Sequence, residues 1–411
     1  MQEEKETLRI ALLSAHSCPV GALGARDTGG MSVYIRELAS ELDRQEHSVD
    51  IYTRVHDIND PVIVPIGEHA RVIHLKAGDE ISIHKLAIYS CLPELGCNLE
   101  NYRKSHGLTY DVLFSHYWLS GYLGSYVKLW WNVPQVLMFH TLGAVKNASG
   151  SGDDDTELRI VTEQEIIRNS QRIIASTQRE KSDLINYYGA EPGNIGVVPC
   201  GVNMDMFRPI EPAAWPGSIE DNEVRLLFVG RIDPIKGIDR LLRAIPMIKS
   251  ARPVKLLIVG GDEPDLFALE HLRALVADLG IQDNVVFHGR VPQETLAAYY
   301  SAADLCVLPS YYESFGLVSL ESLACGTPVV ANDVGQMRSI INQGHNGYVT
   351  PDNRPETLAE YLSLGLTKFS RHTTDTAAMR SSVSTYTWKT VATGVVQELR
   401  TALALQSAPV A

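Results

Sequence analysis

Two cations in the segment GRIDPIKG, Arg231 and Lys236, have the chemical types and the spacing that suit an anionic ligand. A guanidinium can grip phosphate oxygens through two parallel hydrogen bonds, and an ammonium adds a compact positive charge. The short spacing allows both side chains to reach one site from a loop and the start of a helix. The alternative is an ordinary basic pair that is solvated at the surface. Which interpretation holds depends on the strands and helices that carry the segment.

Two carboxylates, Glu313 and Glu321, bracket the segment ESFGLVSLE, which predicts a helix that starts near Gly316. Free backbone amides at such a start, around Leu317 and Val318, suit a phosphate. Glu321 lies about one turn inside the helix, where its carboxylate can accept hydrogen bonds from two vicinal hydroxyls. Such a pair is otherwise a surface feature, but its place after an apolar strand favours a binding site.

Two histidines end apolar runs, His116 in VLFSH and His140 in QVLMFH. A single histidine in such a place is more often a satisfied core residue than a catalyst. Here Tyr117 and Thr141 follow directly. Two polar strand ends of this kind favour a polar pocket over two unrelated core residues.

Gly29 and Gly30 precede a helical pattern over residues 31–44. Glycine lets the backbone approach a ligand closely, and a helix start offers free amides and a partial positive charge. A plain loop that needs a positive φ is the alternative.

Short apolar runs, several of them unbroken, predict strands that are buried on both faces. Helical patterns lie between some of them, including residues 157–170, so the first half is expected to be α/β with a mostly parallel sheet. Ligands of such sheets bind beyond the carboxyl ends of the strands. The runs cover residues 8–14, 49–54, 71–75, 112–116, 135–140, 172–177 and 195–199.

A proline-rich, acidic segment over residues 208–222 predicts a linker, after which the strand pattern restarts. Two open α/β domains are therefore expected, over residues 1–207 and 208–385. Because polar strand ends occur in both, the site is expected in the cleft between them. The second set of runs covers residues 225–230, 255–260, 285–289, 305–310, 328–332 and 347–350.

The composition excludes several classes of partner. The chain has 411 residues with a net charge of −13, and 45% of them are hydrophobic. Such a chain is a folded globular protein, and its acidic balance argues against broad binding to nucleic acid or to an anionic membrane. A few well-placed Arg and Lys residues can still make a local positive site.

Targeting and motif signals favour a cytoplasmic protein with reduced thiols. The N-terminus lacks a signal-peptide pattern, no apolar stretch reaches the roughly 18 residues of a membrane span, and the six cysteines form no CxxC pair. Trp130 and Trp131 are expected to be buried rather than to anchor a surface. Residues 147–156 are expected to be a mobile loop whose three aspartates fix no metal geometry. Neither GxxxxGK(S/T) nor GxGxxG occurs, which weakens kinase and dehydrogenase interpretations.

Jointly, the E-x7-E segment, GRIDPIKG and DTGGMSVYIRELA resemble the family-four glycosyltransferases of GT-B architecture, over roughly residues 8–400. The resemblance implies two Rossmann-like domains that face a central cleft, with residues 386–411 crossing back onto the first. It implies a retaining transfer of a hexose or N-acetylhexosamine from a nucleotide diphosphate sugar, with UDP the favoured nucleotide. It implies neither a metal nor a cofactor, since the nucleotide sugar is a co-substrate, and it leaves a homodimer open.

The resemblance also assigns roles in donor binding. Arg231 and Lys236 would hold the diphosphate, Glu321 the ribose hydroxyls, and Glu313 hydroxyls of the transferred sugar. His140 would lie near the reacting centre. The implied catalytic residues are His140, Glu313, Arg231 and Lys236, and the implied donor-binding residues are Gly30, Arg231, Lys236, Arg290, Val291, Glu313, Phe315, Gly316, Leu317, Val318 and Glu321.

Within the family, FHTLGAVKN, SHYWLSG and GGM are most similar to the enzymes of mycothiol biosynthesis that transfer N-acetylglucosamine to inositol phosphate. Those enzymes read GGMN, whereas this chain has Ser32, so a phosphorylated acceptor is better supported than inositol itself. Sucrose-phosphate synthases, which use fructose 6-phosphate, are the nearest alternative. A lipid glycosyltransferase, another nucleotide-sugar enzyme and a non-catalytic binder are weaker ones. The implied acceptor-binding residues are Gly29, Gly30, Ser32, Lys85, His116, Tyr117, Thr141 and Arg159.

Overall fold

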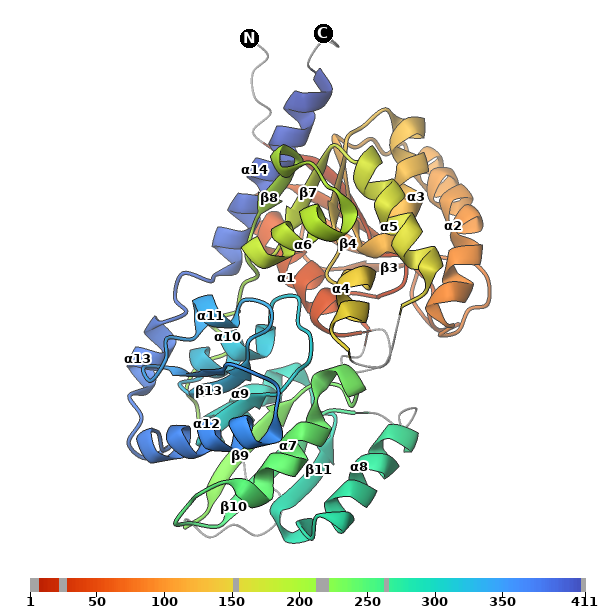
Figure 1. The fold of residues 1–411 in the computed structure, drawn as a ribbon. Helices are drawn as coiled ribbons and strands as arrows, with labels where there is room; N and C mark the ends of the chain where they lie inside the picture. The colour runs from red at the N-terminus through yellow and green to blue at the C-terminus, as the bar shows by residue number, and fades with distance from the viewer. Residues whose placement is uncertain (1–6, 22–27, 151–154, 212–221, 262–265, 408–411) are drawn as a thin grey trace.

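The computed structural model describes residues 7–21, 28–150, 155–211, 222–261 and 266–407, which form two α/β domains (Figure 1). The strands of the first domain are β1 (Arg9–Leu13), β2 (Ser48–Arg54), β3 (Ile63–Pro65), β4 (Ala70–Leu75), β5 (Val112–His116), β6 (Gln135–Met138), β7 (Arg172–Ala175) and β8 (Ile195–Val197). They form one sheet in the order β3-β4-β2-β1-β5-β6-β7-β8. The described pairs are parallel, except that β3 runs antiparallel to β4.

The second domain contains a parallel sheet in the order β11-β10-β9-β12-β13-β14. Its strands are β9 (Val224–Val229), β10 (Val254–Val259), β11 (Val285–Gly289), β12 (Leu305–Leu308), β13 (Val329–Asn332) and β14 (Gly347–Thr350). The predicted fold class, two α/β domains with mostly parallel sheets, is confirmed. Most of the expected linker, residues 212–221, lies outside the described residues.

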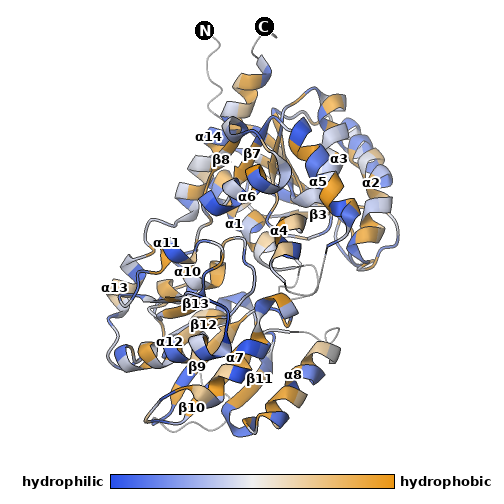
Figure 2. Ribbon diagram, in the orientation of Figure 1, coloured by the Kyte–Doolittle hydropathy of each residue, from blue (hydrophilic) through white to orange (hydrophobic). Residues whose placement is uncertain are grey.

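Helices cover both faces of each sheet, and the buried strands form the apolar interior of each domain (Figure 2). The helices are α1 (Gly30–Arg44), α2 (Lys85–Ser105), α3 (Tyr117–Trp131), α4 (Gly143–Ala148), α5 (Glu157–Asn169), α6 (Gln178–Tyr188), α7 (Ile238–Ala244), α8 (Leu266–Asp278), α9 (Leu296–Ala302), α10 (Leu317–Ala324), α11 (Met337–Ile340), α12 (Pro355–Lys368), α13 (Thr376–Ser381) and α14 (Trp388–Ser407). The last helix, α14, packs against α1, β6 and β7 of the first domain (Figure 1).

Each sheet has a topological switch point, where the strand order changes direction from a central pair. These pairs are β1 with β5 and β9 with β12. A crevice opens at such a point because successive connections leave to opposite faces of the sheet. The loops that follow β1, β9 and β12 carry Gly29, Arg231 and Glu313, and β5 ends at His116, so the topology places the candidate residues at the two crevices.

Several expectations about individual segments are wrong. Trp130 is 52% exposed rather than buried, whereas the Trp131 indole donates a 2.7 Å hydrogen bond to Glu100. The segment 147–156 is not one loose loop, because its first residues end α4 and Asn147 bonds the backbone of Asp155. Residues 151–154, with two of the three aspartates, lie outside the described part of the chain.

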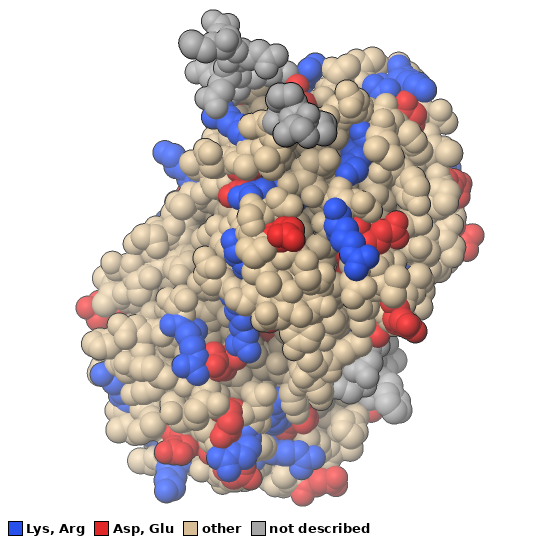
Figure 3. Space-filling model, turned by 45° about the horizontal axis from the view of Figure 1, so that its top comes forward, with Lys and Arg blue, Asp and Glu red and all other residues tan. Residues whose placement is uncertain are grey.

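The surface and the thiols match the expectations from composition. All six cysteines are free. Acidic and basic side chains alternate on the face drawn in Figure 3, where the described residues gather no continuous basic patch. Across the described residues, no helix combines the length and apolarity that a membrane crossing requires.

Three loops at the carboxyl edge of the second sheet interlock through their backbones. The Tyr311 amide donates to the Ile235 carbonyl at 2.8 Å, and Asn332 donates to the carbonyl of Pro309 at the same distance. Gly237 adopts a φ of 65°, and a Cβ there would lie 2.2 Å from the Pro309 carbonyl oxygen. The loops after β9, β12 and β13 therefore hold one another, and through them the residues of the crevice.

We expect Gly237→Ala to destabilise the protein more than Gly280→Ala. Both glycines adopt a left-handed φ, 65° and 67°, but a Cβ on Gly280 would meet no described atom within 4 Å. Gly280→Ala should lower the free energy of unfolding by about 1 kcal/mol, the cost of holding alanine in the left-handed conformation. Gly237→Ala should cost about 1–3 kcal/mol more, as overpacking does. Urea unfolding of both variants measures the difference, and equal midpoints would contradict the interlocked loops.

Candidate active site

The starts of α1 and α10 meet across the boundary between the domains. A Cβ built on Gly30 would lie 3.6 Å from Leu317 Cδ1, so the first residues of the two helices are in near contact. Each helix start presents free amides and the positive end of a dipole. Two such ends directed at one place create a positive potential without using any side chain.

Direct contacts between the domains surround this point. The Leu142 amide donates to the Tyr312 hydroxyl at 3.4 Å, and Arg179 donates to the Asp333 carbonyl at 3.0 Å. Arg36 on α1 donates to the Gln293 side chain of the second domain. The carboxyl ends of the two sheets therefore face each other, as the sequence predicts.

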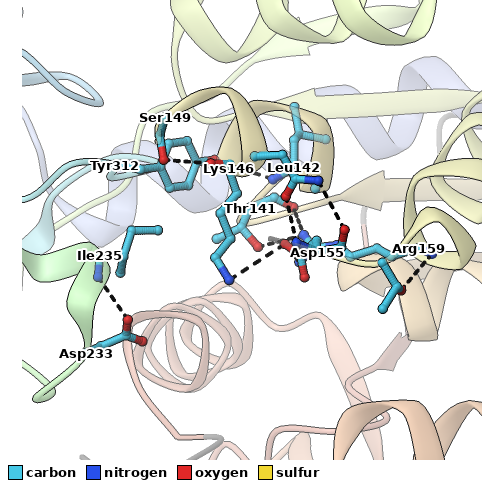
Figure 4. A network of polar contacts seen from close by, with 12 residues as sticks. Thr141, Leu142, Lys146, Ser149, Asp155, Arg159, Asp233, Ile235 and Tyr312 are labelled. Atoms are coloured by element: carbon cyan, nitrogen blue, oxygen red, sulfur yellow. Dashed lines mark hydrogen bonds and ion pairs between the residues drawn. The ribbon is translucent and has the colours of Figure 1, made fainter. Parts of the chain in front are cut away.

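Both cations of GRIDPIKG are paired with carboxylates. Lys236 Nζ lies 2.6 Å from Glu313 Oε1, which also accepts a 2.8 Å hydrogen bond from the Ser310 hydroxyl. Arg231 pairs with Asp233 at 3.3 Å, and Asp233 in turn caps the amide of Ile235 (Figure 4). The loops after β9 and β12 thus join the predicted residues into one charged cluster.

Glu321 is buried within α10, and its carboxylate accepts a 2.8 Å hydrogen bond from the Tyr300 hydroxyl. Burial raises its pKa to about 7, against the hydrogen bonds from Tyr300 and Gln293, which lower it. A carboxylate held in this state is close to half-charged at neutral pH. Only its ionised form can accept hydrogen bonds at both oxygens from hydroxyls that approach it.

The remaining predicted donor residues lie around this helix and at the sheet edge. Phe315 is buried. Gly316 adopts a φ of 102°, and a Cβ there would lie 2.3 Å from Met337 Cε, so both its conformation and its surroundings require glycine. Val318 follows in the first turn of α10. Arg290 and Val291 directly follow β11, two strands away from β9 in the sheet.

The two predicted histidines form one pair at neighbouring strand ends. His116 Nδ1 lies 2.7 Å from His140 Nε2, and the Tyr34 ring packs against both. His140 lies two residues beyond β6, because this strand ends at Met138 instead of residue 140. His140 and Tyr117 have positive φ values of 61° and 74°, a strained backbone that is typical of functional sites.

Burial keeps this pair uncharged. It lowers the pKa of His140 to about 3 and lowers the pKa of His116 well below its usual value. His116 Nε2 is buried with no partner among the described atoms. An unpartnered N–H is rarer in folded proteins than an unpartnered acceptor, so we infer that His116 donates from Nδ1 and that His140 carries its proton on Nδ1.

Tyr117 is the centre of the residues predicted to bind the acceptor. Its ring lies 5.7 Å from Lys85 Nζ and 4.8 Å from Arg159 Cζ. The Arg159 guanidinium donates to the hydroxyl of Thr141 at 2.9 Å (Figure 4). Side chains from α2, α3, α5 and the loop after β6 therefore converge at one positive place.

His16 belongs to this cluster, although the sequence analysis missed it. Its ring lies 4.3 Å from the Tyr117 ring, and burial, followed by the charges of Lys85 and its other neighbours, lowers its pKa well below the usual value. His16 follows β1 in the segment LLSAHS. The strand-end pattern that singled out His116 and His140 would have found it.

The first turn of α1 differs in part from the expectation. Gly29 has an extended φ of −170°, and no described atom lies within 4 Å of a Cβ built there, so the positive-φ alternative does not apply to it. Ser32 is fully buried, and its hydroxyl lies 2.6 Å from the Ser17 hydroxyl. Ser32 therefore ties α1 to the loop after β1.

A cavity of about 280 Å³ opens between the domains beside Glu313. It lies toward β7 and β13 rather than at the two switch points. Its walls combine carboxylates with aromatic hydroxyls, and they include Arg179, Glu180, Tyr311, Tyr312, Glu313 and Asp333.

Comparison with known proteins gives matches along most of the chain. Residues 28–206 match the family model described as Glycosyltransferase Family 4, and residues 211–372 match the model described as Glycosyl transferases group 1. The D-inositol 3-phosphate glycosyltransferase of Corynebacterium diphtheriae is 36% identical over 87% of this chain and 86% of the relative. The D-inositol 3-phosphate glycosyltransferase 2 of Catenulispora acidiphila is 40% identical over 84% of each.

Solved structures give the same picture. The sucrose-phosphate synthase of Thermosynechococcus elongatus superposes with a TM-score of 0.86 and 31% identity, over 96% of this chain and 98% of the other. The expected architecture, two Rossmann-like domains facing a cleft, is thereby confirmed.

The neutral histidines predict a loss of stability in mild acid. A group whose pKa is lowered in the folded state binds its proton mainly when the chain unfolds. The stability from His116 and His140 is therefore complete above pH 6.5 and lost as the pH falls below it. Each can contribute up to about 1.4 kcal/mol per pH unit. Urea unfolding between pH 7.5 and 5 should show a shallower decline for H116Q/H140Q than for the exposed control H345Q. Equal slopes would show that the pair is charged in the folded protein.

Proposed function

Because the chain belongs to the family-four glycosyltransferases, as a hexosyltransferase, we propose that it moves a hexose or N-acetylhexosamine from a UDP-sugar to a small phosphorylated acceptor such as inositol phosphate, with retention of configuration. The observation that carries the proposal is the meeting of the α1 and α10 starts, together with two clusters of cationic side chains in the two domains. One cluster, with Arg231 and Lys236, belongs to the second domain. The other, with Lys85 and Arg159, belongs to the first.

The donor diphosphate would lie between the helix starts. Cleavage of the sugar–phosphate bond leaves negative charge on the diphosphate, which Arg231, Lys236 and the amides of Leu317 and Val318 stabilise as it develops. The proposed site uses these groups and no metal. Neighbouring strands are about 4.8 Å apart, so the loops after β9 and β11 are separated by roughly two strand spacings, which supports Arg290 and Val291 as contacts of the base.

The sugar and the ribose would each meet a carboxylate. Glu321 accepts hydrogen bonds from the ribose hydroxyls, and Glu313 binds hydroxyls of the sugar while it keeps its contact with Lys236. His140 stays neutral, and its Nδ1–H donates to an oxygen near the reacting carbon. Retention follows if the acceptor attacks from the side of the leaving group and a phosphate oxygen takes its proton.

The acceptor phosphate would bind around Tyr117. Lys85 and Arg159 supply positive charge, and Tyr117 and Thr141 supply hydroxyls. His16 and the open side of Gly29 border the rest of the acceptor. This arrangement supports an acceptor that carries a phosphate ester. It does not favour one carbon skeleton of the acceptor over another.

A second candidate, synthesis of sucrose phosphate from UDP-glucose and fructose 6-phosphate, has an observation in its favour. The structural match to a sucrose-phosphate synthase covers 96% of the chain at 31% identity. In addition, the Ser32 hydroxyl is occupied by Ser17 and does not project toward the acceptor as a longer amide would. Both candidates share the phosphate-binding residues, so the two differ only in the acceptor skeleton.

A substrate panel tests the proposal. UDP-glucose, UDP-N-acetylglucosamine and their ADP and GDP counterparts are each combined with inositol 3-phosphate, fructose 6-phosphate, inositol and fructose, and nucleotide release is measured. We expect turnover with a UDP-sugar and a phosphorylated acceptor, and at least tenfold less with the same acceptor lacking phosphate. Equal turnover with both acceptors would refute a phosphate-specific site, and NMR of the product establishes its anomeric configuration.

The pKa of Glu321 predicts how donor affinity depends on pH. Its raised value of about 7 means that the carboxyl group gains a proton as the pH falls below 7 and then loses an acceptor for the ribose hydroxyls. The Kd of the preferred UDP-sugar, measured by calorimetry, should rise by up to about tenfold per pH unit below 7. E321Q should bind more weakly than the wild type at pH 8 but with little pH dependence between 6 and 8. A wild-type Kd that stays flat over this range would contradict ribose binding by the ionised carboxylate.

A further inference from the structure

Groups of this chain accept hydrogen bonds from four of the five N–H groups of the Arg159 side chain. Its Nε donates to Glu163 at 2.7 Å, and Nη1 donates to Asp155 at 2.7 Å. Its Nη2 donates to the carbonyl and the hydroxyl of Thr141 at 2.8 and 2.9 Å. Since the Arg159 side chain is only 4% exposed, an acceptor phosphate can take two of its N–H groups only by replacing one of these partners.

The two carboxylates on Arg159 are not equally replaceable. Glu163 is fully buried, and its second oxygen also accepts hydrogen bonds from the Gly143 amide and the Tyr188 hydroxyl. Its removal would leave these donors unsatisfied in the interior, which is costly. The Asp155 side chain is 19% exposed, so water can solvate its carboxylate as it leaves.

Asp155 is also held in a way that lets its side chain move. Its amide donates to the Asn147 side chain at 2.6 Å, and the same side chain donates to its carbonyl at 3.1 Å. Asn147 therefore fixes the backbone of Asp155 and leaves the carboxylate to rotate about χ1. Lys146 Nζ lies 3.9 Å from that carboxylate, on the side of the cleft that faces Asp233 (Figure 4).

We propose that the Asp155 carboxylate occupies the place of the acceptor phosphate on Arg159 and Lys146, and that it determines which acceptors bind by being displaced. The proposal rests on the proposed function, because it takes Arg159 as a phosphate ligand. It adds Lys146 as a further ligand of that phosphate. A phosphate monoester near neutral pH carries between one and two charges and three acceptor oxygens, more than the carboxylate it replaces. An uncharged hydroxyl acceptor cannot displace Asp155, and therefore meets a filled site.

A competing role for Asp155 gives the opposite result. If Asp155 only orients Arg159, its loss disorders the guanidinium and weakens phosphate binding. If Asp155 competes with phosphate, its loss strengthens binding. The sign of the change in affinity therefore separates the two roles.

The test measures binding of inorganic phosphate to the full chain by calorimetry, with UDP present at saturation. We expect D155N to bind phosphate about tenfold more tightly than the wild type, as the removal of one charge beside the ligand predicts. The control E157Q removes an exposed carboxylate from the start of α5, the helix that carries Arg159. Among the described residues Glu157 forms no hydrogen bond or ion pair with Arg159, so E157Q should change the affinity less than twofold. D155N/K146M should lose most of the gain. Unchanged or weaker binding by D155N overturns the proposal.

Kinetics and a second variant separate this inference from the proposed function. With the phosphorylated acceptor of the panel, D155N should lower KM and leave kcat unchanged. Lys85→Met, which leaves the buried pair of Arg159 and Glu163 intact, should weaken phosphate binding in both backgrounds. If Lys85→Met has no effect, the phosphate site itself is misplaced and the proposed function fails with it. If Lys85→Met weakens binding but D155N does not strengthen it, only the role of Asp155 is refuted.

Discussion

Positive charge gathered in one cleft must be balanced inside the protein, and this constraint governs the arrangement of the cleft. Lys236 is balanced by Glu313, Arg231 by Asp233, and Arg159 by Glu163 and Asp155. Without these carboxylates the cations would repel one another and the two helix starts they surround. The overall charge of −13 is consistent with this arrangement, because a site for anions carries its own acidic partners.

The topology of the sheets decides where this balance is needed. The switch points at β1–β5 and β9–β12 leave crevices that helices do not cover, and the loops after these strands fill them. Such loops would be mobile if each stood alone. The close approach of Gly237 to the Pro309 carbonyl and the bonds from Asn332 make them one packed unit. The cations thus keep fixed positions although none of them lies in a strand.

The sequence predicted the elements well because periodicity and strand-end residues are local signals. Unbroken apolar runs identified most strands, and the segments around Arg231 and Glu321 lie at the carboxyl edge as expected. The short antiparallel strand β3 was missed, since its residues are largely exposed and its short apolar segment is interrupted by prolines. Trp130 was misjudged for a related reason: the two tryptophans share a helix, but successive residues point in directions about 100° apart.

The sequence could not predict which side chains pair in the site, because the pairs join residues that are far apart in the chain. Lys236 and Glu313 are separated by 77 positions, and His116 and His140 by 24. No spacing rule connects such pairs; only the order of strands in the sheet does. The same reason hid Asp155, which in the sequence was one of three similar aspartates in a polar segment. In the structure it is the carboxylate that shares Arg159 with a fully buried partner.

The histidine pair provides a hydrogen-bond donor without adding a positive charge to the site. Burial keeps His116 and His140 neutral, so the pair can donate a hydrogen bond but cannot supply a cation to the leaving diphosphate. The strained backbone of Tyr117 and His140, at the ends of adjacent strands, costs about 1–3 kcal/mol each and accompanies the contacts of these side chains with His116, Lys85 and Arg159. That strain would not persist if any other conformation placed both side chains equally well. In the proposed function the cleft therefore has two kinds of polar group: the helix starts and cations would meet phosphate charge, and a neutral imidazole would donate a hydrogen bond to an oxygen atom between them.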